Sequence, residues 1–166
     1  VLSTQSSLGS LSDQIAGYLP GDLQVRLNEA VDVDEVRAVV EADLDVTAVE
    51  GWLTTQAFRI RPDGGENGNI NLVGLPPTST EVEPTLLEGR WLRADDDHAV
   101  VVNTHLVDEE PDVRVGDDVV LDVEGHRRDW RVVGISSTTL MGPGAYVDVD
   151  DLGATIERPG QATVVA

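Results

Sequence analysis

Residues 115–135 read VGDDVVLDVEGHRRDWRVVGI, and this stretch holds two short valine-rich segments, Asp118–Val123 and Trp130–Ile135, that predict β-strands. A third segment of the same kind, Ala99–Asn103, lies shortly before it. Gly134, inside one of these strands, indicates that another backbone approaches closely at that point. The close spacing of the strands predicts a compact β-rich unit.

The sequence before this unit alternates between helical and extended patterns. Asp32 is a candidate N-cap with Glu35 at the capping-box position, so we expect a helix that carries Val36 and Val40 to begin there. Turn-forming residues at 63–68 separate two alternating segments and predict a hairpin. The elements predicted before residue 76 are a helix at 8–19, a strand at 23–27, the helix after Asp32, a strand at 46–61 and the second hairpin strand at 69–75.

Pro76 and Pro77 interrupt this pattern, and the strands that follow are shorter and closer together. We therefore expect an α+β fold in which residues 1–79 and 138–166 form one half and residues 80–137 form an inserted β-rich lobe. The phrases VDVDEV (31–36) and VDVDDL (147–152) are alike, and each places carboxylates where they can accept N–H groups at a helix start. The C-terminal part is predicted to contain a strand at 145–149, a short helix at 150–156 and a last strand at 162–165.

The amino-acid composition excludes some classes of function. With 31 acidic residues, 11 basic residues and no lysine, the formal net charge is −20. Nucleic-acid binding is not expected, because a phosphate backbone requires a basic surface. The same charge predicts that the isolated domain is a monomer. The chain has no cysteine and no apolar run near 18 residues, and it begins at Val1 without methionine, so we expect a piece cut from a longer protein.

Five phrases, taken in order, resemble one family. They are LEGRWL (87–92), AVVVN (99–103), VGDDVVL (115–121), WRVVGI (130–135) and AYVDV (145–149). Their order and spacing resemble the extracytoplasmic core of MacB/FtsX-like ABC-transporter permeases, over residues 80–152, while the first 75 residues are similar only in the order of their elements. Gly89, before Arg90, also suits a turn that needs an open backbone conformation.

The resemblance implies a domain on the extracytoplasmic face of the cell membrane, between the first two transmembrane helices of a permease. It implies a porter-like α+β half built from both chain ends and interrupted by the smaller β-rich lobe. The partners would be the transmembrane helices of the same permease, a cytoplasmic ATPase reached indirectly, and an outer-side protein or peptide of unknown identity. The implied function is non-catalytic coupling of ATP-driven motion to that partner. Both chain ends should then leave one face, with Leu8 and Val165 within two or three helix diameters, of about 10 Å each, of one another.

Few residues are candidates for chemistry. Asp95–His98 is the densest set of metal-ligand side chains, but four consecutive residues in a turn cannot all converge on one ion, so a solvated loop is predicted. His105 and His126 show no ligand spacing with it. The hydroxyls of Ser136–Thr139 have no adjacent base. We predict no catalytic residue, no cofactor and no metal site.

Leu140, Met141 and Pro143 form an apolar tip on a Gly/Pro-rich segment, which suits a contact with a partner. Two other functions stay open from the sequence: a free-standing extracellular binding or adhesion module with acidic, Ca²⁺-dependent loops, and a metal-dependent hydrolase that uses Asp95–His98.

Overall fold

A computed structural model describes residues 25–43, 48–82, 84–137 and 142–165. Six of its strands close into a barrel in the order β2–β3–β8–β5–β7–β6, because β6 pairs with both β7 and β2. The β3–β8 and β5–β7 pairs are parallel and the other four pairs are antiparallel. The barrel strands are β2 (Gly51–Ile60), β3 (Glu66–Leu75), β5 (Ala99–Asn103), β6 (Asp118–Val123), β7 (His126–Ser136) and β8 (Gly144–Asp148).

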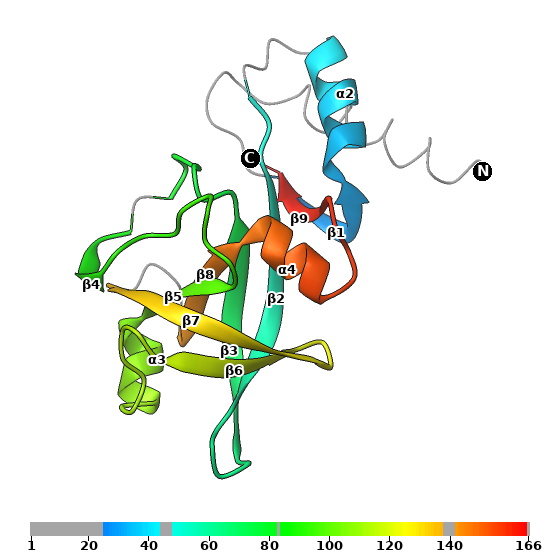
Figure 1. The fold of residues 1–166 in the computed structure, drawn as a ribbon. Coiled ribbons are helices and arrows are strands. Elements are labelled where there is room, and N and C mark those ends of the chain that lie inside the picture. Colours follow the sequence, from blue (N-terminus) through cyan, green and yellow to red (C-terminus); the bar gives the residue numbers. More distant parts are fainter. Residues whose placement is uncertain (1–24, 44–47, 83, 138–141, 166) are drawn as a thin grey trace.

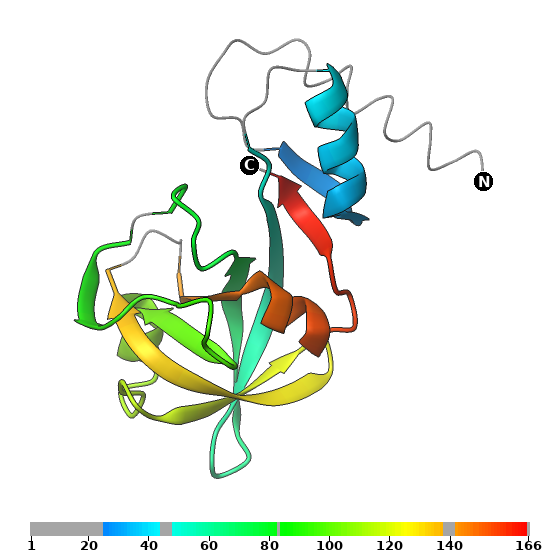
Figure 2. The ribbon, with the colours of Figure 1, turned by 45° about the horizontal axis from the view of Figure 1, so that its top comes forward.

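A smaller terminal lobe lies at one end of the barrel (Figures 1 and 2). It consists of β1 (Val25–Asp32), α2 (Val33–Asp43) and β9 (Gln161–Val165), together with the start of β2. Val36 and Val40 of α2 pack with Val49 and Val165 in a small core of its own. β9 pairs with β1 on one side and with Gly51 and Trp52 of β2 on the other, so β2 belongs to both parts.

The barrel core follows from the alternation of its strands. Val100 and Val102 of β5 face one buried cluster with Trp130, while Val101 faces a second cluster with Tyr146. The first cluster also receives Leu106 from α3 (Thr104–Glu109) and Leu152 from α4 (Val149–Thr155). The second includes Leu92, and Val82 and Trp91 pack against it. Both faces of β5 are therefore buried, which is why its sequence is a continuous apolar run.

Most elements expected from the sequence are present, and the α+β class is confirmed. The hairpin around residues 63–68 joins β2 to β3. Asp32 caps α2, since its Oδ1 accepts hydrogen bonds from the N–H groups of Asp34 at 2.9 Å and Glu35 at 3.2 Å. Asp148 caps α4 in the same way through Asp150. The expected helix at 8–19 lies outside the described residues.

Three features were not expected: the closure of the barrel, the helix α3 and the short strand β4 (Leu86–Gly89). Residues 76–143 lie between β3 and β8, which are adjacent parallel strands, so this segment is an insertion in the topology. Its strands nevertheless pair with β2 and β8, which lie outside residues 80–137. Whether residues 80–137 form a separate lobe stays a prediction.

Gly89 and Gly134 behave as their sequence contexts predict. Gly89 has φ +71°, and a Cβ built at Gly134 would lie 2.2 Å from the carbonyl oxygen of Arg90. The backbones of β4 and β7 are therefore almost in contact at this point. In the described part of the chain, no helix is long and apolar enough to cross a membrane.

Candidate functional site

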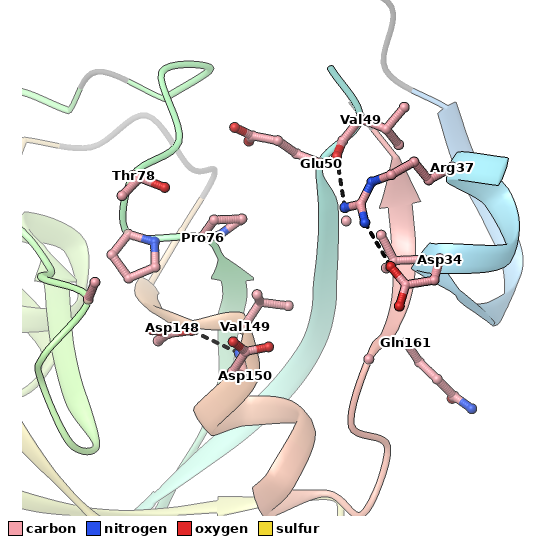
Figure 3. A pocket seen from close by; sticks show the side chains of 15 residues that line it. Asp34, Arg37, Val49, Glu50, Pro76, Thr78, Asp148, Val149, Asp150 and Gln161 are labelled. Carbon is pink, nitrogen blue, oxygen red and sulfur yellow. Dashed lines mark hydrogen bonds and ion pairs between the residues drawn. The ribbon is translucent and has the colours of Figure 1, made fainter. Parts of the chain in front are cut away.

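A cleft of about 540 Å³ lies between the terminal lobe and the barrel (Figure 3). α2 forms one wall with Asp34 and Arg37, and the start of α4 forms the other with Asp148 and Asp150. The remaining lining residues are Val33, Val49, Glu50, Gly51, Pro76, Pro77, Thr78, Ala94, Val149, Gly160 and Gln161. The cleft thus separates two parts of the fold that β2 and residues 157–160 connect.

The polar groups of the cleft mostly bind one another. Arg37 donates to Asp34 Oδ1 at 2.7 Å and to the carbonyl of Val49 at 3.4 Å, both within the terminal lobe. Ser79 donates from Oγ to Glu50 at 2.5 Å and so ties the segment after β3 to the start of β2. Burial raises the pKa of the Asp148 carboxyl, which faces the cleft while it caps α4. Among the described residues that line it, the cleft has four carboxylates and one arginine, and it lies between two lobes.

The acidic run at 95–98 is divided between two sets of contacts. Asp96 accepts two hydrogen bonds from Arg90, at 2.8 and 2.6 Å, and these bonds hold the pKa of its carboxyl below the usual range. Asp97 and His98 approach Asp151 of α4, and one ligand atom from each of these three residues lies within 4.8 Å of the others. Asp151 also accepts from the His98 backbone N–H at 2.9 Å, and the Asp97 side chain is 91% exposed. The structure therefore joins two of the sequence candidates to a third residue that the sequence did not indicate.

The predicted contact tip lies between β7 and β8, and Leu140 and Met141 fall outside the described residues. Pro143 is half-buried, and its carbonyl accepts from the Asn71 N–H at 2.9 Å. Asn103, which is fully buried, fixes the end of this segment: its Nδ2 donates to the Gly142 carbonyl at 2.9 Å and its Oδ1 accepts from the Gly144 N–H at 3.0 Å. The end of the loop at β8 is thus fixed to the barrel.

A buried ionic cluster lies where the β2–β3 hairpin meets the segment after α3. Glu110 is 1% exposed and accepts hydrogen bonds from Arg59, Arg61 and Asn67. Arg59, itself buried, also donates to both carboxylate oxygens of Asp112 at 2.8 and 2.6 Å. The bonds from Arg61 above all lower the pKa of Glu110, so the carboxylate stays ionised although it is buried. No local sequence pattern points to this cluster, because its members come from segments about 50 residues apart.

The cluster predicts how stability depends on pH. Hydrogen bonds from Arg59 lower the pKa of Asp112 from 3.8 to about 2. Because the folded-state pKa is lower than that of the unfolded chain, the contribution is present above about pH 4 and is lost as the pH falls toward 2. The Asp112 side chain is 62% exposed, so we expect a contribution of at most about 1 kcal/mol. Urea unfolding of wild type and Asp112→Asn should differ at neutral pH and converge near pH 2; a difference that does not change with pH would contradict the assignment.

The protein is an α+β barrel domain whose described ends, Val25 and Val165, are direct partners in the β1–β9 pair. The family model of the MacB-like periplasmic core domain matches residues 2–166. The chain belongs to this family, and it is the extracytoplasmic domain of a MacB-like ABC-transporter permease. The resemblance seen in the sequence and the predicted location are thereby confirmed.

Solved structures show the same fold. The periplasmic region of MacB from Actinobacillus actinomycetemcomitans superposes with a TM-score of 0.64 at 14% identity, over 86% of this chain and 71% of that one. The extracellular domain of the noncanonic ABC-type transporter YknZ from Gram-positive bacteria gives a TM-score of 0.62 at 13% identity, over 86% and 80% of the two chains. No curated protein sequence matches the chain significantly.

Proposed function

We propose that this domain transmits ATP-driven motion of the transmembrane helices to a partner on the outer side of the membrane, without catalysis of its own. The observation that carries the proposal is the pairing of the two described ends. Val25 and Val165 are direct partners in the β1–β9 ladder, so both ends of the described domain leave from one place. This is the geometry that an insertion between two neighbouring membrane helices needs. Leu8, which the sequence analysis placed on the same face as Val165, lies outside the described residues, so that prediction stays a prediction.

The route for the motion is the strand β2. β9 holds the start of β2 at Gly51 and Trp52, and the far end of the same strand pairs with β6 at Ala57–Ile60. Thr163 of β9 adds a side-chain link, because its Oγ1 accepts from the Thr54 N–H at 2.8 Å. A displacement of the chain ends therefore acts on the barrel through β2 and the 157–160 connection, and the cleft between the lobes can widen or narrow.

In this proposal the terminal lobe belongs to the porter-like half, residues 1–79 and 138–166, and residues 80–137 are the inserted lobe. The insertion between the adjacent strands β3 and β8 supports this division. The outer-side partner contacts the segment with Leu140, Met141 and Pro143, whose end Asn103 fixes to the barrel. Membership of a transporter-domain family supports a non-enzymatic role, and the cytoplasmic ATPase acts on the domain only through the membrane helices.

Spin labels across the cleft test this coupling without knowledge of the substrate. The domain has no cysteine, so cysteines placed at Asp34 and Asp150, on opposite walls, label those two positions within it. We expect the distance distribution in the full permease with its ATPase to change between the nucleotide-free and ATP-bound states. A pair at Glu66 and Arg128, both exposed on the barrel, is the matched control and should not change. A cleft distance that is the same in both states would contradict the proposed coupling.

A further inference from the structure

β4 is the last strand of the sheet, at the opposite end from β1, and within the described residues it pairs only with β7. All four of its residues are exposed. Leu86 and Leu87 are 38% and 59% exposed, and together with Phe58 they are the large hydrophobic side chains that the described part of the chain leaves open to solvent. An open edge with two exposed leucines is unusual, because native proteins ordinarily cover or charge such strands.

The backbone of β4 offers hydrogen-bonding groups on its free side. The carbonyl of Thr85 accepts from the Ser137 N–H at 2.8 Å, so Thr85 faces β7, and the register of the β4–β7 pair shifts only after Leu86. In an extended strand, successive residues direct their N–H and C=O groups to opposite sides. The N–H and C=O of Leu86 therefore point away from β7, toward the open edge, where an extended chain can pair with them.

The charge around this edge defines the partner further. Glu88 lies on the strand itself and makes no ion pair within the described residues, and Glu81 is exposed just before it. Arg90, which directly follows β4 in the sequence, is paired with Asp96 at 2.6 Å and so does not offset these carboxylates. These three properties match one kind of ligand. It has an extended backbone, apolar side chains that can pack on Leu86 and Leu87, and positive charges that can pair with Glu81 and Glu88.

We propose that β4 is a strand-addition site for an extended peptide segment, with alternating apolar and basic residues, from the outer-side partner. This inference rests on the proposed function, and it places the contact next to Ser137, whose N–H donates to the carbonyl of Thr85. Main-chain hydrogen bonds give such a complex its affinity, and side chains give it specificity. A second copy of this domain is the poorer occupant, because each copy carries a charge of −20 and would add its own acidic edge.

The test uses the 166-residue chain and a synthetic octapeptide that alternates arginine and valine, with both ends capped. We expect binding in the micromolar range and slower hydrogen exchange at the Leu86 amide. A peptide of the same charge with alternate amides N-methylated loses the donors for the edge, and it should bind at least about tenfold more weakly. Equal binding of both peptides would show attraction to the acidic surface alone and would overturn the inference.

Two variants at one position separate the backbone from the side chain. Leu86→Pro removes the outward N–H, as prolines do on natural strand edges, and should weaken binding by about tenfold. Leu86→Ala removes the side chain but keeps the N–H, and should weaken binding less. If Leu86→Pro does not fold, the N-methylated peptide on wild type still decides the question.

Two further results bear on the occupant. If the chain elutes as a dimer at low concentration and Leu86→Pro returns it to a monomer, the edge is an interface between copies and the proposed partner is wrong. If the octapeptide fails to bind while the spin-label pair still responds to ATP, the strand-addition site is wrong and the coupling function stands.

Discussion

Replacing Glu110 by alanine is expected to lower the free energy of unfolding by about 4 kcal/mol. Glu110 is 1% exposed and holds Arg59, Arg61 and Asn67 at once, so its loss leaves the buried Arg59 guanidinium with only the exposed Asp112 as a partner. Breaking one side of a buried ion pair costs more than the pair itself contributes, because the remaining charge stays desolvated. Urea unfolding at neutral pH, followed by tryptophan fluorescence, measures the change.

Arg127→Ala is the matched control for this prediction. Arg127 also binds two carboxylates, Asp122 at 3.0 Å and Glu66 at 3.3 Å, but its side chain is 57% exposed. Ion pairs in solvent contribute about 0–1 kcal/mol, so this variant should unfold almost as wild type does. Equal losses in Glu110→Ala and Arg127→Ala would mean that the cluster does not act as a buried ionic anchor.

The elements that the sequence predicted well are those whose signals are local. Asp32 and Asp148 begin α2 and α4 because a carboxylate two residues away from a free N–H needs no tertiary contact to bind it. The β5 segment Ala99–Asn103 was predicted with the correct ends, because a short run of consecutive valines favours a strand. These local predictions are correct because tertiary packing favours the same conformation as the local sequence does.

The features that were missed depend on distant pairing. The barrel closes only when β6 meets β2, and these strands lie about 60 residues apart. The ionic cluster runs against the ordinary hydrophobic pattern of β2, because Arg59 is buried while its neighbour Phe58 is 41% exposed and lies against Gly68. β4 has four exposed residues and no alternation, so only its contact with β7 makes it a strand. All three features depend on contacts between distant segments, and no local sequence pattern indicates those contacts.

Gly134→Ala is expected to destabilise the domain by about 3 kcal/mol, or roughly 10 °C in Tm, and to release β4 from β7. The added Cβ would lie 2.2 Å from the carbonyl oxygen of Arg90, and the nearest atoms are all backbone of residue 90. A flexible side chain could move aside, but here the whole strand must shift and lose the hydrogen bond from the Arg90 N–H to Val133. Thermal unfolding measures the loss, and hydrogen exchange at the Arg90 amide reports whether β4 has separated.

Gly125→Ala distinguishes this crowding from the general cost of replacing a glycine. Gly125 has φ +87° and nothing within 4 Å of a built Cβ, so alanine there meets conformational strain but no collision. That strain costs about 1–2 kcal/mol and leaves β4 in place. Gly134 presents the opposite case, since its conformation is open to alanine and only the contact with residue 90 forbids it. We therefore expect exchange at the Arg90 amide to accelerate in Gly134→Ala and to stay at the wild-type rate in Gly125→Ala. Wild-type exchange in both variants would mean that β4 can shift along β7 and keep its pairing, and the close contact at Gly134 would then not be what holds this edge of the sheet.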